Sequence, residues 1–285
     1  MNHLLCFGFG FSARALAARL DRREWKVSAT SRDAEGIAAI EAQGFHGLLF
    51  DSTLQIGPDV THLLISAPPG EHGDPVLRLF QAQLQQLSKS LKWVGYLSTT
   101  GVYGDRGGDW VDEDSPLEPT TARGQRRLEA ERNWLKLHKD FGLPVHLFRL
   151  AGIYGPGRNQ LLTVRDGSAR RIIKPGQIFS RIHVEDIAGV IAASIAKPHP
   201  GRAYNVCDDE PCPPQEVVAY AAGLLGLPLP PEIPFEEAEL SPMAKSFYAE
   251  SKRVSNRRIK AELNHRLIYP NYREGLRALL DTLTA

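Results

Sequence analysis

The chain has 285 residues, of which 42% are hydrophobic, so it can bury a large core as one sizeable domain or two small ones. Its formal net charge of +1 excludes a strong overall attraction to nucleic acid or to an anionic membrane surface. The cysteines Cys6, Cys207 and Cys212 form no C-x-x-C pair, which favours a reducing, cytoplasmic compartment and no metal site. No apolar run approaches the ~18 residues that cross a bilayer, so we expect no membrane span.

Short apolar runs alternate with helical patterns through the first half of the chain, which is typical of a parallel sheet wrapped by helices. The predicted strands cover residues 4–8, 26–31, 47–51, 62–66, 93–98 and 145–150. The predicted helices between them cover 12–20, 34–42, 75–91 and 122–139. From Gly155 onward, turns rich in proline and glycine separate shorter elements, with helices at 184–196, 214–225 and 255–263 and a strand at 204–206.

These elements predict an α/β fold, a doubly wound parallel sheet of the Rossmann type with a smaller C-terminal substrate lobe. The dinucleotide-binding domain is expected over 1–157, with returns to the sheet near 180–206. The substrate lobe is expected over 158–178 and 207–285.

A glycine-rich turn, Gly8-Phe9-Gly10-Phe11-Ser12-Ala13, follows the first predicted strand and opens a helix. This context favours dinucleotide binding by a G-x-G-x-x-A motif. Gly8 permits the tight turn, and Gly10 lets the backbone approach a pyrophosphate. The start of the helix at Phe11 and Ser12 supplies unpaired N–H groups, and Ala13 takes the third small position. The alternative is a strand-to-helix turn that binds no ligand.

The end of the second predicted strand indicates which dinucleotide binds. Ser31 and Arg32 stand where an acidic residue would hold the ribose of NAD. A guanidinium suits a 2'-phosphate, and a charge-assisted contact of about 1.5 to 3 kcal/mol favours NADP roughly 10- to 100-fold. Asp33, one position later, can still reach the ribose, so NAD stays open.

The segment Tyr96-Leu97-Ser98-Thr99-Thr100-Gly101-Val102-Tyr103-Gly104, followed by Arg127-Leu128-Glu129-Ala130-Glu131, resembles the extended short-chain dehydrogenase/reductase family. In that family a strand-end hydroxyl binds the reacting oxygen, a tyrosine moves the proton, and a lysine four residues later binds the nicotinamide ribose. The resemblance assigns the hydroxyl to Thr99, with Ser98 beside it. It places Arg123 at the tyrosine and Arg127 at the lysine, so the usual proton donor is missing.

The same resemblance implies further roles. Arg127 can still hydrogen-bond a ribose or a phosphate. Tyr103 or a bound water would handle the proton, and in relatives such a tyrosine mainly lines the substrate pocket. Asp51, Ala67 and Pro68 would contact the adenine and line the dinucleotide groove. Ala151 and Gly152, before a Tyr-Gly-Pro-Gly turn, would border the nicotinamide. A Tyr-x-x-x-Lys motif at Tyr248 and Lys252 lies in the wrong half of the chain, and chance explains it by default.

The pattern is similar to the atypical, epimerase/dehydratase-like branch of the family. It implies an NADP-dependent oxidoreductase or epimerase-like enzyme acting on a small polar hydroxyl or carbonyl compound, which Arg123 allows to be anionic. The alternative is a non-catalytic protein in which dinucleotide occupancy alters partner binding. The helices at 75–91 and 122–139 resemble those that relatives pair into a homodimer. Apolar surface for this would come from Leu77, Leu79, Phe80, Leu84 and Leu87.

Overall fold

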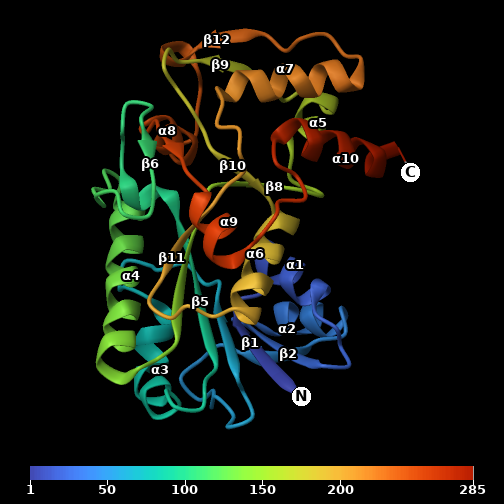
Figure 1. Ribbon diagram of the computed structural model, residues 1–285. Helices are drawn as coiled ribbons and strands as arrows, with labels where there is room; N and C mark the ends of the chain where they lie inside the picture. The colour runs from blue at the N-terminus through green and yellow to red at the C-terminus, as the bar shows by residue number, and fades with distance from the viewer. Residues whose placement is uncertain (285) are drawn as a thin grey trace. The chain divides into compact units, whose positions relative to one another are not determined.

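The structure is a computed structural model that describes residues 1–284, and the chain divides into two compact units (Figure 1). The first unit comprises Met1–Thr99, Ala122–Arg149 and Ile187–Tyr204, and the second comprises Thr100–Thr121, Leu150–Asp186 and the chain from Asn205 onward. Each unit draws on several separate segments of the sequence. The predicted boundary between a dinucleotide-binding domain and a substrate lobe stays a prediction.

A seven-stranded sheet forms the centre of the first unit, with strand order β11-β7-β5-β4-β1-β2-β3. β1 runs parallel to both β2 and β4, and the connections proceed outward from it in both directions. The predicted doubly wound parallel sheet is therefore confirmed. The strands are β1 Asn2–Phe7, β2 Trp25–Ser31, β3 His46–Leu49, β4 His62–Ile65, β5 Trp93–Thr99, β7 Val145–Leu150 and β11 Ala203–Val206.

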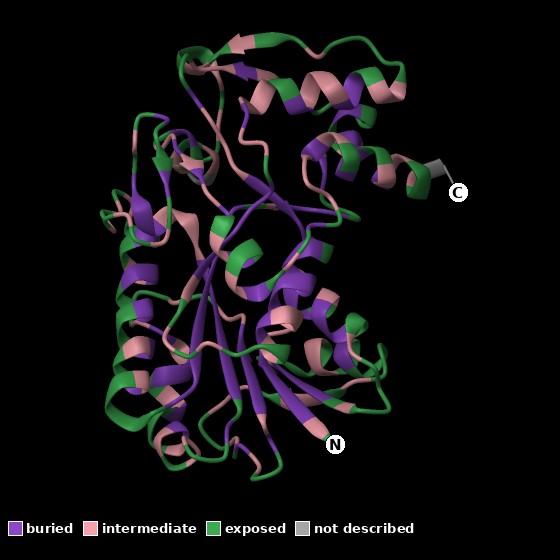
Figure 2. Cartoon of the chain, in the orientation of Figure 1, coloured by how far each residue is buried: buried purple, intermediate pink, exposed green. Residues whose placement is uncertain are grey.

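Helices cover both faces of this sheet. Figure 1 shows α3 and α4 on one face and α1, α2 and α6 on the other. Their bounds are α1 Phe11–Arg19, α2 Ala34–Glu41, α3 Pro75–Gln86, α4 Ala122–Phe141 and α6 Val184–Ala196. The inner strands β4, β5 and β7 are almost wholly buried, as expected for a parallel sheet covered on two sides (Figure 2).

The apolar side of α3 packs into the core of its own unit. Leu77, Phe80 and Leu84 are buried in a cluster with β1, β4 and α4, and Leu79 and Leu87 pack against that cluster. The Asp74 carboxylate caps the helix by accepting the N–H groups of Val76 and Leu77. Leu77, Phe80 and Leu84 therefore offer no apolar surface to a second copy, Leu79 and Leu87 are half-buried, and the expected homodimer stays a prediction.

The second unit is built from short elements. Three pairs of parallel strands join β8 Gly152–Tyr154 with β10 Arg181–His183, β9 Arg171–Ile173 with β12 Glu232–Pro234, and β6 Trp110–Val111 with β13 Arg253–Val254. The helices are η1 Thr100–Tyr103, α5 Gln160–Arg165, α7 Pro214–Leu225, η2 Phe235–Glu237, α8 Pro242–Tyr248, α9 Arg257–Leu263 and α10 Tyr272–Thr284. Its main apolar cluster lies between α5, α7 and α10.

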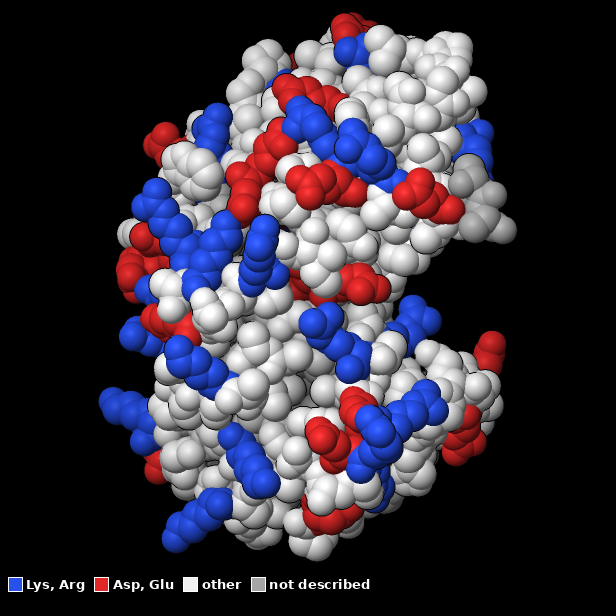
Figure 3. Space-filling model, turned by 45° about the vertical axis from the view of Figure 1, so that its right-hand side comes forward, with Lys and Arg blue, Asp and Glu red and all other residues white. Residues whose placement is uncertain are grey.

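Positive and negative side chains are interspersed on the face drawn in Figure 3, in keeping with the near-zero net charge. No helix within residues 1–284 is long and apolar enough to cross a membrane.

Candidate functional site

The glycine-rich turn connects β1 to α1. Gly8 has a φ of +86°, which favours glycine, and its N–H donates to Thr30 Oγ1 at 3.0 Å. A Cβ at Gly8 would lie 3.3 Å from the backbone nitrogen of Ala67, so the turn and the end of β4 approach closely. Gly10 is the N-cap of α1 and supplies no side chain to the helix start. The first-turn N–H groups therefore remain available to an anion.

The predicted motif residues at the start of α1 differ in how far they are buried. Ser12 and Ala13 are buried against the sheet, which explains the need for small residues there. Phe11 is half-buried, and Pro68, the residue after Ala67, is exposed. The structure thus brings the glycine turn and the predicted groove residue Ala67 together.

The residues after β2 differ sharply in how their side chains are used. Arg32 is exposed, and its guanidinium has no hydrogen-bond or ion-pair partner among residues 1–284. The Asp33 carboxylate caps α2 by accepting the N–H of Gly36 at 2.8 Å. Ser31 Oγ packs against Gly36, where an added Cβ would lie only 2.0 Å away. The cation is therefore available to a ligand, whereas the nearby carboxylate already has a structural role.

Asp51 lies two residues beyond the end of β3 and not on the strand as expected. Its carboxylate accepts the N–H and the hydroxyl of Thr53, at 2.8 and 2.6 Å. These hydrogen bonds hold the pKa of Asp51 below its usual value. The charged carboxylate stabilises the turn after β3, and contact with an adenine stays a prediction.

Ser98 and Thr99, the last two residues of β5, have different surroundings. Ser98 is buried, and its hydroxyl donates to Glu131 Oε1 at 2.5 Å. Glu131 also accepts Arg149 Nη2 at 2.9 Å, and their side chains are only 2% and 5% exposed. Thr99 is half-buried, and successive strand residues point to opposite faces of a sheet. Thr99 thus remains the better candidate for direct contact with a substrate.

Arg127, which the resemblance places at the family's lysine, points into the first unit. Its side chain is buried, and Nη1 donates to the carbonyl oxygen of Leu97 and lies 3.5 Å from Tyr96 Oη. Nearby, burial raises the pKa of Asp74, whose carboxylate accepts Trp134 Nε1 at 3.1 Å. At least one guanidinium N–H of Arg127 therefore braces β5. Its predicted bond to a ribose stays a prediction.

Tyr103 belongs to the second unit and is fully buried. Its hydroxyl donates to Asn205 Oδ1 at 2.7 Å. Asn205, also fully buried, donates from Nδ2 to the carbonyl of Ser255 at 3.1 Å and from its backbone to Glu113 Oε1 at 2.8 Å. A hydroxyl that is buried and already donates its proton is poorly placed to protonate a substrate. The geometry argues against the substitute-acid role expected for Tyr103.

Ala151 and Gly152 also lie in the second unit, between β7 and β8. Their N–H groups donate to the carbonyls of Val206 and Ser180, both at 3.1 Å. Among the later residues, Lys252 Nζ pairs with Glu250 at 2.7 Å, and the ring of Tyr248 packs against Phe179. Lys252 and Tyr248 thus contact other residues and are not arranged as a catalytic pair. Within residues 1–284, no three His, Cys, Asp or Glu side chains are grouped to hold a metal ion.

Comparisons with known proteins agree with this architecture. The family model described as the NAD dependent epimerase/dehydratase family matches residues 75–207. A solved structure of a functionally unknown conserved protein from Silicibacter pomeroyi is 54% identical, with all of both chains covered and a TM-score of 0.94. The chain belongs to the NAD-dependent epimerase/dehydratase family.

Two further relatives show how far the family likeness extends. Protein YeeZ of Escherichia coli K12 is 28% identical over 257 residues, which cover 81% of this chain and 86% of YeeZ. The dTDP-glucose 4,6-dehydratase of Bacillus anthracis, solved in complex with NAD, is 18% identical with a TM-score of 0.77. That alignment covers 100% of this chain and 96% of the dehydratase, and it shows the fold alone. Family membership thus fixes the scaffold and leaves the reaction to the site.

Sequence reasoning did not anticipate the Ser98–Glu131–Arg149 network. The sequence does not indicate that the partner of Glu131 lies on β7. One signal was available, because a glutamate among Leu128, Ala130 and Trp134 lies on the apolar side of α4. A charged residue on such a side needs a partner of opposite charge.

Proposed function

We propose that the chain binds NADP(H) and acts as an oxidoreductase or epimerase-like enzyme on a small polar hydroxyl or carbonyl compound. The observation that carries the cofactor choice is the contrast after β2. Arg32 has no partner among residues 1–284, whereas Asp33 is engaged as the cap of α2. A free guanidinium suits a 2'-phosphate, and the Asp33 carboxylate already uses Oδ1 to cap α2.

The geometry of the glycine-rich turn also fits a dinucleotide. Gly8 has a φ of +86° and a Cβ there would crowd the Ala67 nitrogen at 3.3 Å, and Gly10 leaves the first N–H groups of α1 without a side-chain cap. We propose that these groups hold the pyrophosphate and that Ser31 and Arg32 hold the 2'-phosphate. The nicotinamide would supply or accept a hydride at the substrate carbon.

The residues of the chain would orient the substrate and polarise it. Thr99 would hydrogen-bond the reacting oxygen from the end of β5. The buried Ser98–Glu131–Arg149 network would fix that strand end, since Ser98 is anchored by a 2.5 Å hydrogen bond. Because Tyr103 donates its hydroxyl to Asn205, the proton would come from water. An anionic substrate group would pair with Arg123.

Calorimetry with NADPH and NADH tests the cofactor. NADPH should bind roughly 10- to 100-fold more tightly, the effect of one charge-assisted contact, and Arg32→Ala should remove most of that difference. Arg19→Ala is the matched control, because Arg19 is also exposed on the first unit without a partner among residues 1–284. Equal affinities for the two cofactors in the unaltered protein would contradict the assignment.

Single-turnover oxidation of bound NADPH, measured against a panel of carbonyl compounds and sugar nucleotides, tests the reaction. Thr99→Val should lower the rate at which a productive substrate oxidises bound NADPH. It should leave NADPH affinity within about threefold, because the hydroxyl would stabilise the reacting oxygen only. An unchanged rate in Thr99→Val would remove Thr99 from the site.

A second function is favoured by the position of Arg127. The residue that replaces the family's lysine is buried and donates to the Leu97 carbonyl. A guanidinium does not act as a base, so the chain lacks the usual proton relay. This supports a non-catalytic protein that responds to dinucleotide occupancy. In that case no panel member would oxidise NADPH, yet hydrogen exchange would differ between the NADPH-bound and NADP-bound forms.

A further inference from the structure

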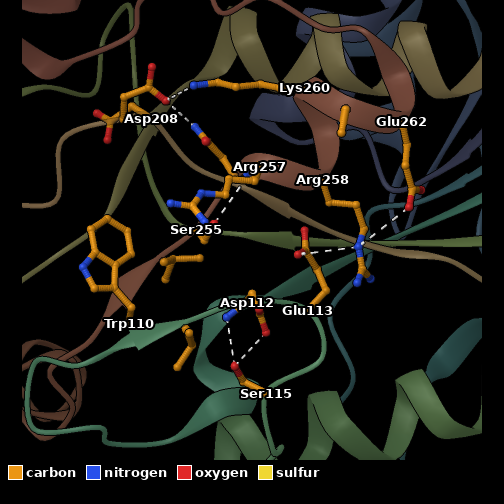
Figure 4. Close-up of a pocket in the computed structure, with 15 residues that line it drawn as sticks. Trp110, Asp112, Glu113, Ser115, Asp208, Ser255, Arg257, Arg258, Lys260 and Glu262 are labelled. Atoms are coloured by element: carbon orange, nitrogen blue, oxygen red, sulfur yellow. Dashed lines mark hydrogen bonds and ion pairs between the residues drawn. The ribbon is translucent and has the colours of Figure 1, made fainter.

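The second unit contains a pocket of about 730 Å³ between the β6–β13 strand pair, the start of α9 and the turn after β11 (Figure 4). The charged residues on its wall are the carboxylates Asp112, Glu113, Asp208, Asp209 and Glu262 and the cations Arg257, Arg258 and Lys260. Arg258 contacts two of these carboxylates, at 3.7 and 3.9 Å, and Lys260 pairs with a third at 2.5 Å. Trp110 and Arg257 on the same wall are exposed. Because charges of both signs are mixed there, the pocket selects no ligand by charge, and we assign it none.

In the first unit, a chain of hydrogen-bonding side chains links β1, β2 and β3. The Asp59 carboxylate lies 2.9 Å from His3 Nδ1, and His3 Nε2 lies 2.8 Å from Ser28 Oγ. Ser28 Oγ also lies 3.4 Å from Nδ1 of His46. Ser28 and His46 are paired residues of β2 and β3, so their side chains share one face of the sheet. The four side chains form a continuous path from Asp59 to His46.

The ends of this path reach water, whereas its middle does not. The side chain of Asp59 is 58% exposed and His46 is exposed, but His3 and Ser28 are buried. Hydrogen bonds from Lys26 Nζ, at 3.0 Å, and from His3 hold the pKa of Asp59 below its usual value. The charged carboxylate only accepts, so His3 Nδ1 carries a hydrogen, and in the neutral ring Nε2 accepts the Ser28 hydroxyl.

Asp59, His3 and Ser28 pair through the same atoms as a Ser-His-Asp hydrolase triad. A nucleophile must be reached by its substrate, however, and Ser28 is only 1% exposed. β2 also pairs with a strand on each side, so its N–H groups are used in the sheet and form no oxyanion hole. The arrangement thus has the proton-transfer part of a triad without access for a substrate.

A second proton on His3 reverses the order of these hydrogen bonds. Protonated Nε2 becomes a donor, so the Ser28 hydroxyl must turn away from it. It can turn toward His46 Nδ1 only while that nitrogen carries no hydrogen. Once His46 is protonated too, Ser28 Oγ faces two N–H donors, and its own hydrogen has no acceptor within the path. With Lys26, three positive groups then surround the one carboxylate of Asp59.

The direction of the pH effect follows from the surroundings of His3. Burial lowers its pKa from 6.5, the hydrogen bond with Asp59 opposes this, and the charges of Lys26 and His46 add to the lowering. The unfolded chain therefore takes up the proton at a higher pH than the folded chain does. The stability that depends on neutral His3 is complete above pH 6.5 and is lost as the pH falls below it.

The segment 46–59 is tied to the sheet at both of its ends by this path. His46 begins the segment as the first residue of β3, and Asp59 ends it. Between them, β3 is only four residues long, stands at one end of the strand order and pairs with β2 alone among residues 1–284. Leu49 is exposed and Leu48 is half-buried. A short edge strand with few buried contacts is among the parts of a fold that open at the lowest cost.

We propose that the path from Asp59 through His3 and Ser28 to His46 is an acid-sensitive latch for residues 46–59. Neutral His3 holds both ends of the segment against β1 and β2. Protonation breaks both ties together, so the segment opens while the inner strands stay paired. The latch acts in the protein without any bound cofactor, and it does not depend on the proposed function.

Hydrogen exchange followed by mass spectrometry tests the latch at pH 7.5 and pH 5.5, with every rate corrected for the intrinsic pH dependence of exchange. β5, at the centre of the same sheet, is the internal reference. Relative to β5, protection of the amides in 46–59 should fall about five- to tenfold at the lower pH, the effect of losing one buried hydrogen bond.

Two variants remove the titration, and one control keeps it. His3→Phe cannot take up a proton, so protection of 46–59 should differ by less than about twofold between the two pH values. His3→Gln also does not titrate and keeps a polar group beside Ser28, so it serves if the phenylalanine variant fails to fold. His72→Gln removes an exposed histidine of the same unit outside the path and should retain the full five- to tenfold fall.

Three results would overturn the latch. The first is equal protection of 46–59 at both pH values in the unaltered protein. The second is a fall of the same size in β5 as in 46–59, which would mean that acid weakens the whole unit. The third is an undiminished fall in whichever His3 variants fold.

Discussion

The buried ion pair between Glu131 and Arg149 allows a quantitative prediction for Glu131→Gln. The side chains are 2% and 5% exposed, so little water can reach the guanidinium once the Glu131 carboxylate is removed. Removing one member of a buried pair costs about 3–5 kcal/mol, because the remaining charge stays buried and uncompensated. An arginine cannot shed its proton to escape this cost. We expect the free energy of unfolding of the first unit to fall by about 3–5 kcal/mol.

Urea denaturation followed by tryptophan emission measures this loss. Trp25, Trp93 and Trp134 all lie in the first unit, so most of the emission reports on that unit. The double variant Glu131→Gln/Arg149→Met should recover most of the stability, since it removes both charges and keeps the volume.

The matched control is Lys136→Ala, which breaks an exposed pair with Asp140 on the same helix. Exposed i,i+4 pairs contribute about 0.3–0.5 kcal/mol, so this variant should be nearly neutral. The reasoning would be refuted by a Glu131→Gln loss below about 1 kcal/mol, or by a double variant no more stable than the single one.

Four further predictions follow from the same contacts. His146 stacks on Trp93, and burial lowers its pKa to about 4 from 6.5, so its protonation opposes folding as pH falls from about 6.5 toward 4. His146→Phe should reduce the stability lost between pH 7.5 and pH 5, measured by urea titration, by about 2 kcal/mol. Gly104→Ala should destabilise the second unit by more than about 1 kcal/mol in thermal unfolding, because φ is +72° and a Cβ would lie 1.9 Å from the Glu118 carbonyl oxygen. Asp33→Ala should cost about 1 kcal/mol through the lost α2 cap while leaving the NADPH-to-NADH affinity ratio unchanged, and a changed ratio would mean that Asp33 holds ribose. A homodimer now rests on the family resemblance alone, and a monomer mass by light scattering at micromolar concentration would exclude it.

The central sheet was predictable because each of its strands is a short apolar run between helical patterns. The strand at 145–150 matches β7, and the helices at 184–196 and 214–225 match α6 and α7. The helix predicted over 75–91 ends at Gln86 instead. Leu87 and Leu91 extend the apolar spacing, but the backbone turns at 87–90 to bring Leu91 and β5 into the core.

The small strands of the second unit could not be predicted. β6 and β13 have two residues each, too few for any period, and their pairing joins residues more than 140 positions apart. For the same reason the sequence did not indicate the pocket beside them. That Trp110 is exposed and Arg257 lacks a partner depends on which side chains the fold brings near, and local patterns do not contain that information.

The inward position of Arg127 bears on how the chain could change its chemistry. Its guanidinium donates to the Leu97 carbonyl, two residues before Thr99 on the same strand. Reverting Arg127 to the family's lysine would therefore remove a brace from the strand that carries Thr99, before any tyrosine at position 123 could make the lysine useful. The intermediate variant would have neither the brace nor the proton relay. A change of chemistry at position 127 therefore also needs a new support for the end of β5.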